Sequence, residues 1–223
     1  TSLLGPSAAV LVGDFWLSKA VELVFGASSY SEVVGLFSKS LTSLAEGEMI
    51  QLEKASSADT QESDYYRIVE CKTATLFYAS TVSAMKSIKA SGEMVRAAKD
   101  YGTSLGIAFQ IKDDILDYVG TDVLGKPTGV DLKEKKITLP LLGALKNSPR
   151  EAEIRSMIMD MDAHPEYQDE IRSFVMDNGG LDYAAECLEK FIGKAKAALG
   201  DIEDSAAKDY LVSIVEYNTL RNI

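Results

Sequence analysis

In LDYAAECLEKFIGKAKAAL, residues 181–199, apolar side chains recur at intervals of three, four and seven positions. The regularly placed side chains are Leu181, Leu188, Ile192, Ala195 and Leu199. These intervals put side chains on one face of an α-helix, because the helix turns once in about 3.6 residues. The same spacing occurs in residues 33–44, and valine and isoleucine do not alternate with polar residues over a long run. The sequence therefore predicts an all-α protein.

Length and composition bound the domain organisation. A chain of 223 residues with 46% hydrophobic residues can bury one sizeable core. Polar, glycine or proline positions interrupt the helical pattern at residues 26–29, 56–61, 91–92, 120–129, 147–149, 164–165 and 179–180. The helices between them should run roughly 15–30 residues, which suits a large bundle. We therefore predict one domain over residues 1–223, a large single-domain helical bundle.

The charge balance argues against several kinds of partner. With 23 basic and 34 acidic residues the net charge is −11, which disfavours attraction to nucleic acid or to anionic lipid. No apolar run reaches the ~18 residues that a membrane span needs, so no integral membrane segment is expected. Cys71 and Cys187 lie in helical patterns without a partner at metal-ligand spacing. We interpret them as two buried thiols in a reducing compartment and expect a cytoplasmic location.

Two common enzyme chemistries lack their motifs in this sequence. The only histidine, His164, precedes Pro165 in a polar connection, which argues against histidine acid–base chemistry and against a histidine-ligated zinc. Neither the glycine-rich dinucleotide motif nor a P-loop string is present. Because the chain is strongly acidic, any anionic substrate would need help from bound cations.

Three aspartates lie close together in FQIKDDILDYVGTDVLGKPTGVD, residues 109–131. They fall near the end of a helix predicted to run from about residue 92 to the glycine at position 120. Asp113 and Asp117 are four residues apart and share a helix face, whereas Asp114 lies about 100° round the helix. Their flanking residues are largely apolar. A carboxylate cluster in such surroundings must be paired, protonated or bound to a metal.

The residue types in this cluster select the metal. Oxygen ligands without a nearby cysteine or histidine favour a hard cation, and Mg²⁺ is the natural candidate; a solvated acidic helix end is the alternative. Lys126 follows on a glycine-rich loop, and Mg²⁺ together with ammonium groups can hold a diphosphate. Lys136 also follows, as do Lys133 and Lys135, which fit a solvated charge run equally well.

Three stretches resemble one known family. The second aspartate-rich region of the trans-prenyl diphosphate synthases is similar to FQIKDDILDYVGTDVLGKPTGVDLKEKKITLP, residues 109–140. Two further matches follow the expected order, VGDFWLSKA at 12–20 and CKTATLF at 71–77. The family includes polyprenyl, geranylgeranyl and farnesyl diphosphate synthases, and essentially the whole chain can be aligned with it. The resemblance implies the all-α bundle of the isoprenoid (polyprenyl) synthase type.

The resemblance also implies roles for particular residues. The metal site would be formed, directly or through water, by Asp113, Asp114 and Asp117, with three Mg²⁺ ions around a bound diphosphate. The allylic diphosphate would be bound by Lys72, Thr73, Gln110, Lys126 and Lys136. The catalytic residues would be Lys72, Asp113 and Lys126. The residues alone leave two of these roles open. Lys72, expected to be unpaired among mostly apolar neighbours, could extend into solvent, and Gln110 could be an ordinary polar helix residue.

The implied reaction is head-to-tail chain elongation. An allylic diphosphate would ionise, isopentenyl diphosphate would attack the resulting cation, and the departing diphosphate would take the proton. Ionisation needs charge stabilisation of the leaving group more than it needs a base, which agrees with Mg²⁺ and lysine. The family also implies a homodimer. The alternatives are a terpene cyclase, a non-catalytic subunit of a heteromeric prenyl synthase, and a helical scaffold whose acidic cluster binds Ca²⁺ or nothing.

The family has two aspartate-rich motifs that face each other, and this sequence shows one. The other motif normally precedes a segment like GPSAAVLVGD, residues 5–14, which here directly follows TSLL. We expect residues between Leu4 and Gly5, and a portion before Thr1, to be absent from this sequence; a truncated, inactive subunit is the alternative. With the motif in place, the small Thr1 and Ser2 would lie where the family has bulky residues that stop chain growth. This predicts a medium- or long-chain polyprenyl product.

Overall fold

The computed structural model describes residues 5–26, 30–120 and 129–220. These residues form helices and no strand, which confirms the predicted all-α class. The helices are α1 (Gly5–Gly26), α2 (Tyr30–Ser57), α3 (Glu62–Val69), the π-helix η1 (Glu70–Ala74), α4 (Thr75–Ser87), α5 (Gly92–Val119), α6 (Val130–Lys133), α7 (Leu139–Leu145), α8 (Glu151–Met159), α9 (Tyr167–Asp177), α10 (Gly180–Ala198) and α11 (Ala206–Leu220). None of the helices in this described part is both long enough and apolar enough to cross a membrane.

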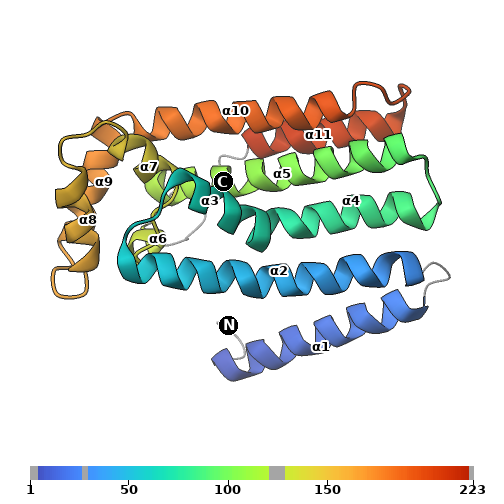
Figure 1. Cartoon of the computed structure of the whole chain (residues 1–223), viewed down its shortest axis with the longest axis horizontal. Coiled ribbons are helices and arrows are strands. Elements are labelled where there is room, and N and C mark those ends of the chain that lie inside the picture. The colour runs from blue at the N-terminus through green and yellow to red at the C-terminus, as the bar shows by residue number, and fades with distance from the viewer. Residues whose placement is uncertain (1–4, 27–29, 121–128, 221–223) are drawn as a thin grey trace.

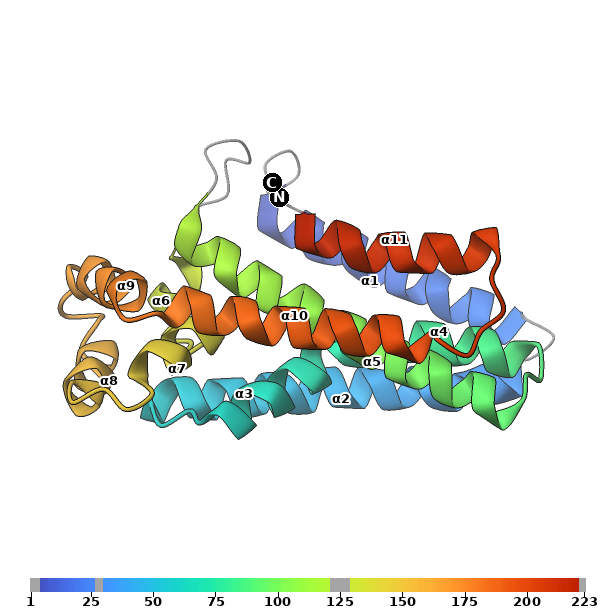
Figure 2. The same ribbon diagram turned by 90° about the horizontal axis from the view of Figure 1, so that it is seen from above.

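The long helices lie lengthwise beside one another (Figure 1). α5 is central, packed against α4 on one side and α10 on the other. α2 packs against α4 and η1, and α1 lies along the outer side of α2. The short helices α8 and α9 close one end of the bundle, as the view from above also shows (Figure 2). This arrangement brings α2, α3, η1 and the C-terminal half of α5 together near that end.

Several predicted helix boundaries are confirmed at glycine and polar positions. α5 begins at Gly92 after Ser91, whose hydroxyl oxygen accepts a hydrogen bond from the backbone N–H of the third helical residue at 3.3 Å. The helix ends at Val119 and is followed by Gly120, which has a positive φ of 72°. Gly179 precedes α10 with a φ of 70°, a conformation that glycine adopts without strain.

Two expectations about the helices are wrong. The shorter helices α3, α4 and α6 to α9 have between 4 and 13 residues, below the expected range. The chain also breaks between α10 and α11, at Gly200 and the polar residues after it, where no interruption is predicted. Here Lys208 Nζ donates to the carbonyl oxygen of Ile202 at 2.6 Å and pairs with Asp204 at 2.9 Å. These contacts stabilise the turn between the two helices.

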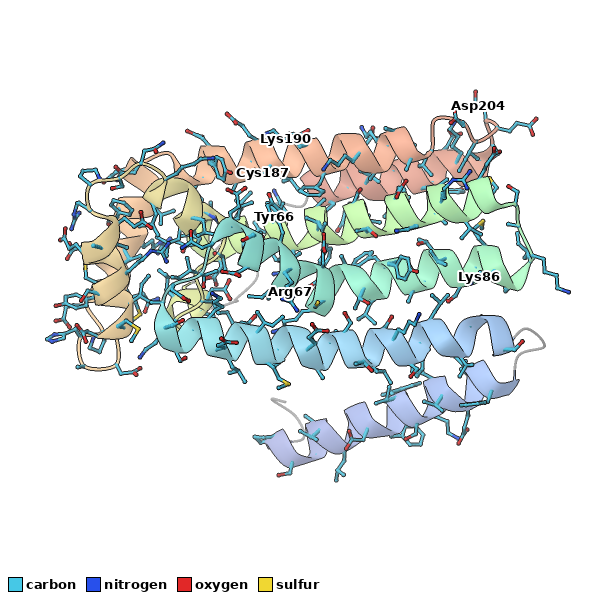
Figure 3. All side chains as sticks on the ribbon, viewed as in Figure 1. Tyr66, Arg67, Lys86, Cys187, Lys190 and Asp204 are labelled. Carbon is cyan, nitrogen blue, oxygen red and sulfur yellow. The ribbon has the colours of Figure 1, made fainter. Side chains whose placement is uncertain are left out.

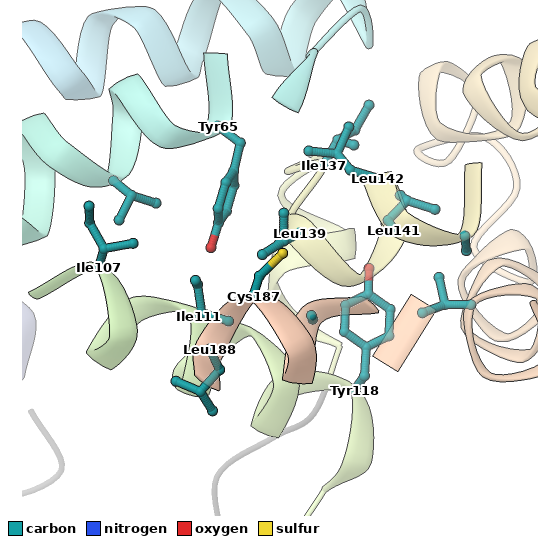
Figure 4. Close-up of a cluster of buried hydrophobic side chains, with 14 of the residues drawn as sticks. Tyr65, Ile107, Ile111, Tyr118, Ile137, Leu139, Leu141, Leu142, Cys187 and Leu188 are labelled. Carbon is teal, nitrogen blue, oxygen red and sulfur yellow. The ribbon is translucent and has the colours of Figure 1, made fainter. Parts of the chain in front are cut away.

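The core lies where α3, α5, α7 and α10 meet (Figure 4). Ile111 of α5 and Leu139 of α7 are fully buried in it. Cys187 of α10 is buried as predicted, whereas Cys71 in η1 is only partly buried, so the expectation of two buried thiols is half right. Both cysteines are free thiols.

Glycines allow η1 to lie very close to both α2 and α5. A Cβ atom built at Gly106 of α5 would lie 2.5 Å from Ala74 Cα, and one at Gly47 of α2 would lie 2.7 Å from Lys72 Cγ. Any side chain at either position would clash with η1. The absence of these side chains therefore determines where η1 sits between the two helices.

Arg155 of α8 joins the end of the bundle that α8 and α9 close to the connection between α2 and α3. Its guanidinium donates to the carbonyl oxygens of Ala58 at 2.7 Å and Thr60 at 3.2 Å, and it pairs with Glu151 at 3.0 Å. Arg155→Ala leaves two carbonyl groups without their donor. We expect the free energy of unfolding to fall by about 1.5–3 kcal/mol, measured by urea denaturation.

Arg150→Ala is the matched control for this prediction. Arg150 directly precedes α8 and also pairs with glutamates, Glu153 at 2.7 Å and Glu170 at 2.8 Å, but these pairs are open to solvent. Exposed ion pairs contribute little to stability. Equal losses for the two variants would contradict the proposed role of Arg155.

Candidate active site

A cavity of about 250 Å³ lies between α2, α3, η1, α5 and the segment 131–138. Its charged lining consists of two acidic and three basic side chains, Asp114, Asp131, Lys54, Lys72 and Lys136. These groups come from elements that are far apart in the sequence. A concave site with a few converging charged groups is suited to a small charged ligand.

The structure brings most of the sequence-predicted site residues together in this cavity. Those that line it are Lys72, Thr73, Gln110, Asp114 and Lys136. Asp113 and Asp117 do not line it. The remaining predictions concern Lys126, the junction at Leu4 and the product-length positions Thr1 and Ser2, all of which lie outside the described residues.

Asp114 is the end point of a chain of hydrogen bonds. Thr73 Oγ1 donates to Gln110 Oε1 at 2.8 Å, and Gln110 Nε2 donates to Asp114 Oδ1 at 2.8 Å. The other carboxylate oxygen, Oδ2, accepts from the hydroxyl of Tyr65 at 2.6 Å. Burial raises the pKa of Asp114 to about 8, against the lowering effect of these two hydrogen bonds. The predicted Gln110 and Thr73 thus reach the predicted Asp114 directly.

Tyr65 is a site residue that the sequence did not reveal. It lies in α3, two helical turns before Lys72, and is 4% exposed. Burial and the neighbouring Asp114 carboxylate raise the pKa of Tyr65 well above its usual value, so its hydroxyl keeps the proton that it donates. The only sequence signal was its position two turns before a predicted site lysine, which does not distinguish it from a core tyrosine.

Asp117 holds the backbone at the start of α6. Its Oδ1 accepts from the backbone N–H of Val130 at 3.1 Å and its Oδ2 from that of Asp131 at 3.2 Å. Its own carbonyl oxygen accepts from the N–H of Gly129 at 3.0 Å. Negative charge is favourable at a helix N-terminus, where backbone N–H groups are unpaired. Asp117 therefore places Asp131 at the cavity.

Asp131 and Lys136 form an ion pair beside Asp114. Lys136 Nζ lies 3.4 Å from Asp131 Oδ1 and also pairs with Glu134. Burial and the nearby Asp117 raise the pKa of Asp131, and Lys136 opposes this change. Asp131 was not predicted as a site residue, because it follows the glycine-rich loop and lies outside the three-aspartate cluster.

Lys72 is positioned by η1 and is not unpaired as expected. Its Nζ donates to Gln51 Oε1 at 3.0 Å and pairs with Glu48, both on α2. It is neither an isolated cation nor a lysine extended into solvent, since its side chain is 28% exposed. A π-helix is wider than an α-helix, and such turns are frequent at functional sites. Here the π turn directs Lys72 towards α2 and Thr73 towards α5.

The other lysines divide between the cavity and the surface. Lys54 lines the cavity and pairs with Asp64 at 3.1 Å and Asp59 at 3.3 Å; it was not among the residues predicted from the sequence. Lys133 is exposed. Lys135 does not line the cavity; its side chain is 22% exposed, pairs with Asp162 at 2.6 Å and donates to the carbonyl oxygen of Met159 at 3.1 Å. The prediction of a solvated charge run is therefore confirmed for Lys133 and wrong for Lys135.

The donor set fits Mg²⁺ when a phosphate ligand is bound with it. Asp114 and Asp131 offer carboxylate oxygens to the cavity, but no group of three or more His, Cys, Asp or Glu within residues 5–26, 30–120 and 129–220 is arranged to hold a metal ion by itself. Mg²⁺ keeps several water ligands and commonly takes one or two carboxylates together with substrate phosphates. The site is therefore suited to a metal–diphosphate complex.

The fold and this cavity define an all-α protein with a cavity lined by both acidic and basic side chains. The model of the family described as polyprenyl synthetase matches residues 1–175. Over 221 residues the chain is 36% identical to octaprenyl diphosphate synthase of Haemophilus influenzae, covering 98% of this chain and 67% of that protein. It is 31% identical to the Escherichia coli octaprenyl diphosphate synthase, covering 98% and 68% respectively. The chain belongs to the polyprenyl synthetase family.

Solved structures agree with this assignment. A polyprenyl synthase from Caulobacter crescentus, complexed with calcium and isoprenyl diphosphate, superimposes with a TM-score of 0.88 and 32% identity, covering 97% of this chain and 67% of that one. Heptaprenyl diphosphate synthase from Staphylococcus aureus gives a TM-score of 0.89 at 28% identity, covering 98% and 68%. These matches confirm the isoprenoid synthase bundle and place the chain among the chain-elongating trans-prenyltransferases.

Proposed function

We propose that the cavity binds the diphosphate of an allylic prenyl substrate together with Mg²⁺. The chain then condenses this substrate with isopentenyl diphosphate to give a medium- or long-chain polyprenyl diphosphate. The main observation behind the proposal is that two carboxylates and two lysines line the same cavity, namely Asp114, Asp131, Lys72 and Lys136. It is supported by relatives named octaprenyl and solanesyl diphosphate synthase and by the neighbour that contains calcium and isoprenyl diphosphate.

The metal and several of the charged side chains have proposed roles in this reaction. Mg²⁺, with three ions proposed, would supply Lewis-acid stabilisation of the leaving diphosphate. Lys72 and Lys136 would exchange part of their present carboxylate pairing for diphosphate oxygens, and Lys126 is proposed to join them. Asp113 and Asp117 are proposed as further metal ligands, with Asp117 also holding the start of α6.

The direct test is a product assay. The purified chain is incubated with Mg²⁺, isopentenyl diphosphate and farnesyl diphosphate, and the products are sized by chromatography. Elongated polyprenyl diphosphates support the proposal. Release of diphosphate without elongation would identify a cyclase instead, and absence of both activities would leave the non-catalytic subunit as the better description.

Lys72→Ala tests the diphosphate site without turnover. Removing one charged donor from a phosphate ligand costs about 1.5–3 kcal/mol, so the Kd for inorganic pyrophosphate with Mg²⁺ should rise by roughly 10- to 100-fold, measured by calorimetry. Lys190→Ala removes the same charge from an exposed position of α10 and should leave Kd unchanged. Similar Kd values for the two variants would contradict the assignment of Lys72.

We also propose that the chain forms a homodimer in the cytoplasm. α1 has no buried residue and exposes large apolar side chains, among them Leu11 at 68%, Trp16 at 67% and Leu23 at 76%. Exposed apolar surface of this kind is typical of protein interfaces, and a second copy is the partner that the family favours. The free thiols of Cys71 and Cys187 are in keeping with a reducing compartment. Analytical ultracentrifugation should give twice the mass of the chain.

A further inference from the structure

Tyr65 contacts the centre of the site from a helix that carries none of the predicted site residues. Its hydroxyl donates to Asp114 Oδ2 at 2.6 Å, and its ring extends from α3 towards α5 through the core (Figure 4). Gln110 Nε2 donates a hydrogen bond to the other carboxylate oxygen, Oδ1, at 2.8 Å. Each carboxylate oxygen therefore has one donor on the protein side. The remaining lone pairs are available to the cavity that Asp114 lines.

The ring of Tyr65 is itself firmly held. It is 4% exposed and packs edge-on against Tyr66 with 5.3 Å between ring centroids. The start of α3 is fixed by a capping box in which the backbone N–H of Gln61 donates to Asp64 at 3.0 Å. A rigid donor of this kind can determine the orientation of a carboxylate, whereas a mobile side chain cannot.

We infer that Tyr65 is a positioning residue that orients the Asp114 carboxylate for the metal–diphosphate complex. The inference rests on the proposed function. Hydrogen bonds from neighbouring groups orient metal-binding carboxylates, and losing such a partner typically weakens metal binding by about 10- to 100-fold. Tyr65 acts on one oxygen, while Thr73 and Gln110 act on the other. Asp114 is thus held from both η1 and α3.

The test is Tyr65→Phe, which keeps the ring and removes the donor. Binding of Mn²⁺ in the presence of inorganic pyrophosphate is measured by electron paramagnetic resonance of the free ion, without turnover. We expect Kd for Mn²⁺ to rise about tenfold, with KM for isopentenyl diphosphate changed less than twofold. Thermal unfolding of the variant is measured alongside, and its fold should be retained.

Tyr66→Phe is the matched control. Tyr66 is the next residue of α3, and its ring lies against Phe191 of α10 at 5.6 Å between centroids, beside Cys187 (Figure 3). This variant loses a hydroxyl from the same helix without touching Asp114, so Mn²⁺ binding should be unchanged. An equal effect of both variants, or no effect of Tyr65→Phe, would overturn the inference.

A double-mutant comparison separates positioning from a general structural effect. In an Asp114→Asn background Tyr65→Phe should cause no further loss of Mn²⁺ affinity, because the group that it orients has gone. Additive losses would overturn the inference. If the unaltered chain binds no Mn²⁺ with pyrophosphate, the proposed function fails and the inference fails with it. If the unaltered chain binds and Tyr65→Phe binds equally well, only the inference fails.

Discussion

Replacing Asp114 by asparagine should lower the rate of chain elongation by about 100- to 1,000-fold. Asp114 is the predicted metal ligand that lines the cavity, and its carboxylate has one hydrogen bond to each oxygen. Asparagine retains the shape but cannot ionise, whereas Asp114 can lose its proton to a solvent base when the cation binds. The measurement is steady-state elongation at saturating Mg²⁺.

We do not expect misfolding of the Asp114→Asn variant to account for its loss of elongation activity. A neutral amide is easier to bury than a carboxylate, and the hydroxyl of Tyr65 can rotate to accept a hydrogen bond from the new amide. The melting temperature of the metal-free Asp114→Asn variant should therefore equal or exceed that of the unaltered chain. Asp182→Asn, on the exposed surface of α10, is the control and should keep full activity. Normal elongation by the Asp114→Asn variant would show that Asp114 is not a metal ligand.

Gly106→Ala should be strongly destabilising although it adds a single methyl group. The new Cβ would lie 2.5 Å from Ala74 Cα and 3.0 Å from its Cβ, so η1 must move away from α5. Overpacking of this kind costs about 1–3 kcal/mol, and each kcal/mol lowers the melting temperature by roughly 2–4 °C in a chain of this size. Pyrophosphate binding should weaken as well, because η1 carries Lys72 and Thr73.

Gly193→Ala is a control in which the change in stability should have the opposite sign. Gly193 lies within α10 and a Cβ built there meets nothing within 4 Å. Alanine favours a helix interior over glycine by about 0.8–1 kcal/mol, so this variant should be more stable than the unaltered chain. A stable Gly106→Ala variant that still binds pyrophosphate would contradict the close packing of η1 on α5.

Apolar spacing was sufficient to predict the fold class, because helical periodicity is a local property of the chain. The ends of α5 at Gly92 and Val119 were predictable for the same reason, since glycine and serine determine them locally. The break after Leu199 was missed, although Gly200 and the polar residues 203–205 that follow are a local stop signal, and the contacts of Lys208 then stabilise the turn. The π turn at Glu70–Ala74 also has no local signal.

The candidate site was predictable where residue chemistry and family motifs coincide. Lys72, Thr73, Gln110, Asp114 and Lys136 were all named from sequence, and all line the same cavity. The roles of Asp113, Asp117 and Lys126 stay predictions. Tyr65 and Asp131 were missed. Tyr65 lies outside the stretches that match the family, and Asp131 lies within residues 109–140 but outside the three-aspartate cluster.

The sequence by itself determined the helical class, the family and the types of charged group that a metal-bound diphosphate requires. Tertiary structure alone decided that Lys72 pairs with Glu48, that Asp117 holds the start of α6 and that Tyr65 reaches Asp114. The physical reason is distance along the chain. A spacing pattern specifies the face of a helix, but contacts between residues 49 positions apart, such as Tyr65 and Asp114, exist only once helices have packed.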